Sequence, residues 1–289
     1  GTVNGVTLTG TVTSSGNLTL GGTLGGITAS QLNSQNISQW TNDSGYITGN
    51  ETITLTGAIT GSTYSFELAT IIRAGMSRMF ENGENVFYYI TTMNENYVHP
   101  DMPEGVEEGI VKGLYPLKTS SVAGKHRVQL MSAGTIMREV EAAAVILERD
   151  YGVVADIWSM TSVNELARQG SKIVRHNMMN PGEEPQIPYV TQCLAATEGP
   201  IIAATDYMRA HTNQLREFMP RSFTVLGTDG FGRSDTRAQL REFFEVDRRY
   251  VVLAAMTALA DEGAIKRGEV AKVMVDLGID PTKPDPTTV

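Results

Sequence analysis

An abrupt change in composition near Tyr64 constrains this chain more than any other feature. From Gly1 to Tyr64 there are two charged residues, Asp43 and Glu51, beside fifteen threonines and twelve glycines. From Ser65 onward the chain carries all 23 lysines and arginines and 30 of the 32 acidic residues. Averages over the whole chain therefore describe neither half, and the sequence predicts a domain boundary between residues 64 and 65.

The first segment, residues 1–64, alternates β-branched residues or leucine with small polar residues, which is typical of short β-strands separated by turns. Its apolar side chains are too few to bury a core in a monomer. It would become ordered by winding with identical chains, or would stay disordered as a Thr/Gly linker. The segment resembles phage tail-fibre repeats in the stretch ITASQLNSQNISQWTNDSGYIT.

Composition also excludes several classes of partner. A net charge of −9 argues against a nucleic-acid backbone, since such sites need clustered lysine and arginine. The longest apolar run, Val251 to Ala260, is too short to span a membrane. The single cysteine, Cys193, forms no internal disulfide, which fits a reducing compartment. We expect a cytoplasmic protein, and because the chain begins with Gly1 we expect a piece of a longer one.

The second segment has the pattern of an α/β domain. Apolar, β-branched runs predict buried strands, and apolar residues at helical spacing predict the helices between them. The expected strands are residues 86–92, 126–134, 153–160, 199–206 and 223–227. The expected helices are residues 66–80, 135–150, 207–219 and 236–244, one that starts at Ser162, and two more toward the C-terminus. This alternation indicates a layered sheet with helices on both faces.

A glycine-rich turn lies between the last expected strand and the helix of residues 236–244. Three glycines within GTDGFGRSD free the backbone, and Thr236 and Gln239 have capping-box spacing at the helix start. Such a junction can bind an anion. The favoured interpretation is a tight structural turn in which Asp229, Arg233 and Asp235 pair with one another. The spacing is neither a P-loop nor a dinucleotide fingerprint.

A polar loop follows the strand of residues 86–92. It contains Asn94, Glu95 and His99, and loops at strand ends often carry function. A solvated loop between domains is the favoured interpretation over direct contact with substrate. Other polar groups give weaker signals: a solvated acidic turn is expected at Glu104, Glu107 and Glu108. The histidines are too widely spaced for a metal site, and we expect Cys193 to be buried and inert.

Several ordered motifs beyond Phe66 carry a resemblance to one enzyme family. They are VFYYITTMNENY, MPEGVEEGIVKGLY, ILERDYGV, SVNELARQG, TDYMRAHTNQLREFMP, DGFGRSD and YVVLAAMTALADEG. Together they resemble the homodimeric type of pyruvate dehydrogenase, the decarboxylating first component of its complex, over residues 66–289. The resemblance implies that residues 65–118 end a pyrimidine-binding domain and that residues 119–289 form a transketolase-type C-terminal domain.

The same resemblance implies thiamine diphosphate and Mg²⁺ in the parent enzyme, which pairs as a homodimer and passes an acetyl unit to the dihydrolipoyl acetyltransferase core. The GDG-type metal motif and the activating glutamate of that family have no match here, so we assign no catalytic, cofactor-binding or metal residue. We expect no bound cofactor and no activity for this chain alone. Two alternatives stay open: a phage-like structural or adhesive fibre protein, and an artificial fusion of the two segments.

Overall fold

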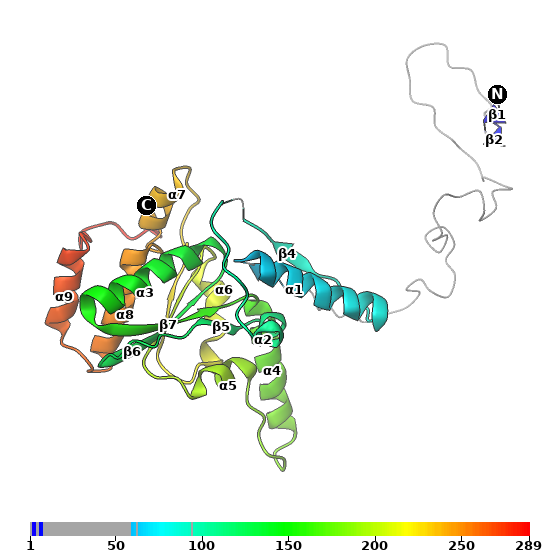
Figure 1. Ribbon diagram of the computed structural model, residues 1–289, viewed down its shortest axis with the longest axis horizontal. Helices are drawn as coiled ribbons and strands as arrows, with labels where there is room; N and C mark the ends of the chain where they lie inside the picture. Colours follow the sequence, from blue (N-terminus) through cyan, green and yellow to red (C-terminus); the bar gives the residue numbers. More distant parts are fainter. Residues whose placement is uncertain (1, 4–5, 8–58, 62, 94) are drawn as a thin grey trace. The chain divides into compact units, whose positions relative to one another are not determined.

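The computed structural model describes residues 2–3, 6–7, 59–61, 63–93 and 95–289 (Figure 1). The chain divides into two units, Gly1–Ile53 and Thr54–Val289. In the first unit, β1 (Thr2–Val3) pairs antiparallel with β2 (Val6–Thr7). The predicted fibre repeats otherwise lie outside the described residues, so that interpretation stays a prediction.

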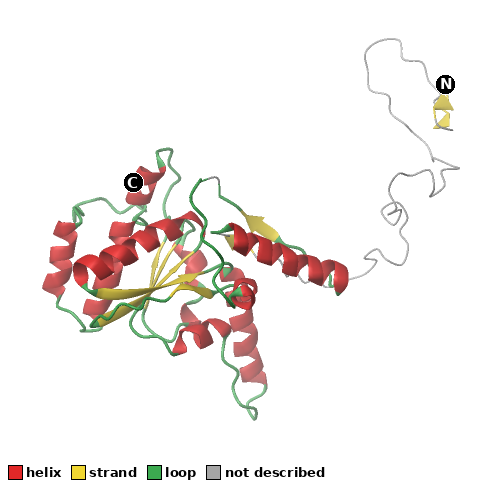
Figure 2. Ribbon diagram, viewed as in Figure 1, coloured by secondary structure: helices red, strands yellow, loops and turns green. Residues whose placement is uncertain are grey.

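A five-stranded mixed sheet forms the centre of the second unit (Figure 2). Its order is β5-β7-β6-β8-β9, with β5 antiparallel to β7 and the other neighbours parallel. The strands are β5 (Tyr115–Lys118), β6 (His126–Ser132), β7 (Val153–Ser159), β8 (Ile201–Ala204) and β9 (Phe223–Leu226). The predicted α/β sheet is thus confirmed, with an antiparallel strand added at one edge.

Side chains alternate across the sheet and fill two separate cores. Val128 and Leu130 of β6 pack with α3 (Met137–Tyr151), whereas Met131 packs with α4 (Val163–Met179) on the opposite face. The α3 face is completed by α8 (Arg248–Asp261) and α9 (Arg267–Asp276), and the α4 face by α5 (Tyr189–Ala195). Helices therefore cover both faces, as the alternation predicted (Figure 1).

The segment before the sheet begins with α1 (Ser65–Met76), which continues into the π-helical turn η3 (Ser77–Glu81). Strand β3 (Ile59–Gly61) pairs in parallel with β4 (Tyr89–Thr91), and α2 (Glu107–Lys112) packs on α1. Residues 59–61 lie on the Thr/Gly-rich side of the predicted boundary, yet they pair within the second unit. None of the described helices is long and apolar enough to cross a bilayer.

Three expectations differ from the structure. The expected helix 207–219 is two short turns, α6 (Arg209–Asn213) and η5 (Arg216–Phe218), because little of that stretch is apolar and buried. Strand β4 is shorter than expected because β3 offers it a partner for three residues. Glu104 lies exposed in a turn, as expected, whereas Glu107 and Glu108 lie in the first turn of α2, where the helix dipole favours carboxylates.

Candidate functional site

The loops after β6, β8 and β9 converge at the carboxyl ends of these parallel strands and line an open cavity of about 370 Å³. The loop after β4 and the helix α7 (Arg237–Phe243) also line it. The lining residues are Met93, Glu95, Thr135, Ile136, Asp206, Thr228, Gly230, Gly232, Arg233, Arg237, Leu240, Arg241 and Phe244. We call this the strand-end cavity. It brings Glu95 and Arg233, two residues singled out in the sequence, into one site.

Glu95 is the centre of a network of arginines. Its side chain is 12% exposed, and it forms ion pairs with Arg138 and Arg241 and lies 3.6 Å from Nε of Arg237. A largely buried carboxylate is stable only when charged donors surround it. Glu95 is therefore largely buried and paired, not solvated as expected. Its ion pairs connect the loop after β4 to Arg138 on α3 and to Arg241 on α7.

A second carboxylate, Glu139 on α3, extends this network. Oε2 accepts a hydrogen bond of 2.8 Å from Nε of Arg248, and Arg241 lies 3.3 Å from Oε1. Burial alone would raise the pKa of Glu139, but the hydrogen bonds from Arg248 and the charges of Arg248 and Arg241 outweigh it. The pKa of Glu139 therefore lies below its usual value, and the carboxylate stays charged.

Asp206 follows β8 directly and presents a different environment. Its Oδ1 is buried and has no hydrogen-bond partner among the described residues. Burial raises the pKa of this carboxyl, and hydrogen bonding to its own backbone and the charge of Arg241 offset only part of that effect. The hydroxyl of Thr228 donates 2.8 Å to the Asp206 carbonyl oxygen, so the loops after β8 and β9 hold each other in place.

The glycine-rich turn is structured by contacts other than the expected local pairing. Asp229 binds the backbone and guanidinium of Arg209, and Asp235 accepts 2.6 Å from the amide of Thr236. The guanidinium of Arg233 stacks 4.0 Å from the ring centroid of Phe243. The expected local pairing is thus present only at Asp235, which binds the start of α7, and it was wrong for Asp229 and Arg233, whose partners are Arg209 and Phe243.

Gly230 has φ +108°, and a Cβ there would overlap the carbonyl oxygen of Pro286. The turn therefore needs glycine at this position both for its backbone conformation and for the close approach of the C-terminal segment. The expected capping at Thr236 is also present: its hydroxyl accepts 3.4 Å from the amide of Gln239. The expected positive φ and the helix cap are therefore both present at this junction.

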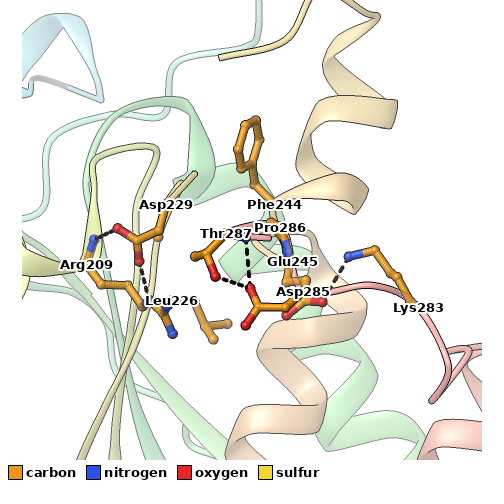
Figure 3. Close-up of a pocket in the computed structure, with 10 residues that line it drawn as sticks. Arg209, Leu226, Asp229, Phe244, Glu245, Lys283, Asp285, Pro286 and Thr287 are labelled. Carbon is orange, nitrogen blue, oxygen red and sulfur yellow. Dashed lines mark hydrogen bonds and ion pairs between the residues drawn. The ribbon is translucent and has the colours of Figure 1, made fainter. Parts of the chain in front are cut away.

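A smaller cavity of about 250 Å³ lies between the turn and the C-terminal segment (Figure 3). Its charged groups contact one another: Lys283 lies 2.9 Å from Glu245, and Asp285 accepts hydrogen bonds from the amide and hydroxyl of Thr287. Asp229 likewise points toward Arg209. Because these carboxylates already accept hydrogen bonds or form ion pairs within the protein, they are poor candidates for binding a ligand in this cavity.

The remaining candidates lie apart from the strand-end cavity. Nδ1 of His99 accepts 2.9 Å from the amide of Ser65, and its ring stacks on Tyr97. Asn94 lies outside the described residues. Cys193 is half-buried, and burial raises the pKa of its thiol. Among the described residues no group of three or more histidine, cysteine or acidic side chains could hold a metal ion.

Sequence reasoning missed Asp206 and the pairing role of Arg241. A signal for Asp206 was present, since it ends the run GPIIAATD and therefore follows a parallel strand at its carboxyl end. No such signal existed for Arg241. Its partner Glu95 lies 146 positions away in the chain, and only the fold brings the two side chains together.

Two family models match the chain. The transketolase-like C-terminal domain matches residues 113–247, and the pyruvate dehydrogenase E1 component middle domain matches residues 5–100. The second match starts within the Thr/Gly-rich segment. A transketolase structure from Pichia stipitis is 16% identical and covers 71% of this chain and 25% of that chain, with a TM-score of 0.46.

Curated relatives agree with these models. The pyruvate dehydrogenase E1 component of Pseudomonas aeruginosa is 53% identical over 225 residues, 78% of this chain and 26% of that protein. The corresponding components are 51% identical in Cupriavidus necator and 49% identical in Escherichia coli K12, with 26% and 25% of those proteins covered. The chain spans about a quarter of the length of these relatives. It belongs to the pyruvate dehydrogenase E1 family, of which it carries a part that includes the transketolase-like C-terminal domain.

Proposed function

We propose that this chain supplies the C-terminal portion of a thiamine-diphosphate-dependent pyruvate dehydrogenase, which decarboxylates pyruvate and transfers the acetyl unit to a lipoyl group. One observation carries the proposal: 53% identity over 225 residues with an E1 component. In this role the chain contributes packing and subunit contact, while sequence outside it holds thiamine diphosphate and Mg²⁺. The partners are a second E1 subunit and the dihydrolipoyl acetyltransferase core, in the cytoplasm, with neither nucleic acid nor membrane.

An exposed apolar stripe along α1 and η3 supports a packing role. Ile72, Met76 and Phe80 recur every four residues, so they lie on one face of the helical segment, and they are 45%, 53% and 79% exposed. A contiguous apolar stripe on a helix is typical of a surface that another protein segment covers. In a longer E1 chain, the preceding part of the enzyme would cover this face.

A chimera tests the proposal. Residues 66–289 replace the matching quarter of the Pseudomonas aeruginosa relative, and pyruvate-dependent acetyl transfer is measured beside that intact relative and a variant with the quarter deleted. We expect the chimera to keep turnover within about tenfold of the intact relative, because the replaced part supplies no cofactor contact. The deleted variant should be inactive. A chimera that folds and assembles yet turns over no faster than the deleted variant would contradict the proposed function.

A further inference from the structure

The strand-end cavity lies where the order of the sheet reverses. Strand β6 has β7 on one side and β8 on the other, so the loops after β6 and β8 diverge toward opposite edges of the sheet. In open α/β sheets, ligands bind in the crevice outside the carboxyl ends of the strands at this switch point. Thr135 and Asp206, which follow these two strands, both line the cavity.

The charges around the cavity favour an anion. Three guanidinium groups line it, from Arg233, Arg237 and Arg241, against the two carboxyl groups of Glu95 and Asp206. Glu95 is already engaged by arginines. Arg233 forms no ion pair with any described residue, and its stacking on Phe243 holds its position without using its N–H donors. A pre-positioned guanidinium with free donors recognises a carboxylate or a phosphate.

The carboxyl group of Asp206 is a second polar feature of the cavity lining. Its Oδ1 is buried and lacks a partner among the described residues, so this carboxyl group has unused capacity to accept hydrogen bonds. Ile136, Leu240 and Phe244 supply apolar surface beside it. The volume of about 370 Å³ lies within the range of about 300–1,000 Å³ that small-molecule sites occupy.

We propose that the strand-end cavity binds a small hydroxylated organic anion, whose acid group pairs with Arg233 and whose hydroxyl donates to the carboxyl group of Asp206. The short carbon body then lies against the apolar walls. The proposal goes beyond the thiamine chemistry, because it assigns no residue of the cavity to that cofactor. Carboxylate and phosphate share the recognition chemistry, so the experiment distinguishes them.

The full chain is titrated with four probes and followed by calorimetry. Glycerol 3-phosphate and D-glycerate carry both an acid group and hydroxyls, methyl phosphate carries only the acid, and glycerol only the hydroxyls. We expect at least one hydroxylated anion to bind saturably and about tenfold more tightly than methyl phosphate, with no saturable heat from glycerol. The tighter of the first two probes shows whether the acid group is a phosphate or a carboxylate.

Matched variants locate the site. Arg233→Gln should weaken the tighter anion about tenfold, whereas Arg267→Gln, an exposed arginine on α9 outside the cavity lining, should leave its affinity unchanged. Asp206→Ala should reduce that affinity to the level of methyl phosphate, and thermal melts confirm folding of each variant. The absence of saturable binding by both hydroxylated anions, or an affinity that Arg233→Gln and Asp206→Ala do not change, would overturn the proposal.

Discussion

The hydroxyl of Tyr115 donates a hydrogen bond of 2.7 Å to Oε1 of Glu67, a carboxylate that is fully buried at the start of α1. Ser159 donates 2.5 Å to the same oxygen, and the amides of Thr63 and Tyr64 donate 2.6 Å and 2.9 Å to Oε2. Four donors from three segments therefore satisfy one buried charge, which fixes α1 against the edge of the central sheet.

Removal of this carboxylate should be costly. In Glu67→Ala the four donors lose their acceptor inside the protein, so we expect the free energy of unfolding to fall by at least about 3 kcal/mol. The matched control is Glu81→Ala on η3, whose exposed carboxylate accepts from Ser77. That change should stay within about 0.5 kcal/mol. Denaturant unfolding measures the free energy of unfolding of both variants. Equal losses would show that the hydrogen bonds to Glu67 are not a main contribution to stability.

The glycine-rich turn gives a paired test at two nearby glycines. Gly230→Val forces a β-branched residue into φ +108° and against the carbonyl of Pro286, so we expect a loss of about 2 kcal/mol or more. Gly232→Val meets no atom within 4 Å and has no positive φ, so its effect should be smaller than about 1 kcal/mol. Thermal melts decide, and an unchanged melting temperature for Gly230→Val would contradict the structural role.

Glu139 should make stability depend on pH. Its pKa in the folded state lies below the usual 4.5, so its contribution is complete above about pH 4.5 and is lost as the pH falls through the folded-state value. Glu139→Gln should therefore lower the free energy of unfolding by about 2 kcal/mol at pH 7, and less at pH 3. Unfolding curves at both pH values check this expectation.

Glu148→Gln, on the same helix, is the control for that experiment. Its carboxylate accepts one long hydrogen bond of 3.5 Å from the amide of Ala155, and no ion pair to it is present among the described residues. We expect no comparable difference between pH 7 and pH 3. A loss in Glu139→Gln that is the same at both pH values would mean that the ion pairs with Arg248 and Arg241 are not its origin.

Much of the α/β core was predictable because its signals are local. The apolar run of residues 126–134 contains β6, because a strand covered on both faces of a sheet needs continuous apolar residues. The helical spacing of apolar residues after it marks α3, which buries one face. Strand β5 was missed because four residues with Pro116 at a sheet edge give no clear alternation. Helix α2 was missed because its acidic start was interpreted as a solvated turn.

The site was less predictable because its chemistry depends on distant pairs. Sequence reasoning singled out Glu95 and Arg233 separately, one in each of two loops, but gave no reason to place them in one cavity. It expected Arg233 to pair with neighbouring carboxylates, whereas its partner is the ring of Phe243 on α7. Spacing along a chain constrains pairs within a helix or a turn, and contacts between loops depend on the whole fold.

The most direct test compares cofactor binding by the chain with cofactor binding by the chimera. Each is titrated with thiamine diphosphate and Mg²⁺ in a calorimeter under identical conditions. If the chain is the C-terminal portion of an E1 component whose cofactor residues lie outside it, the chimera should give saturable heat and the chain of residues 1–289 should give none. Saturable, micromolar binding by the chain alone would contradict this assignment.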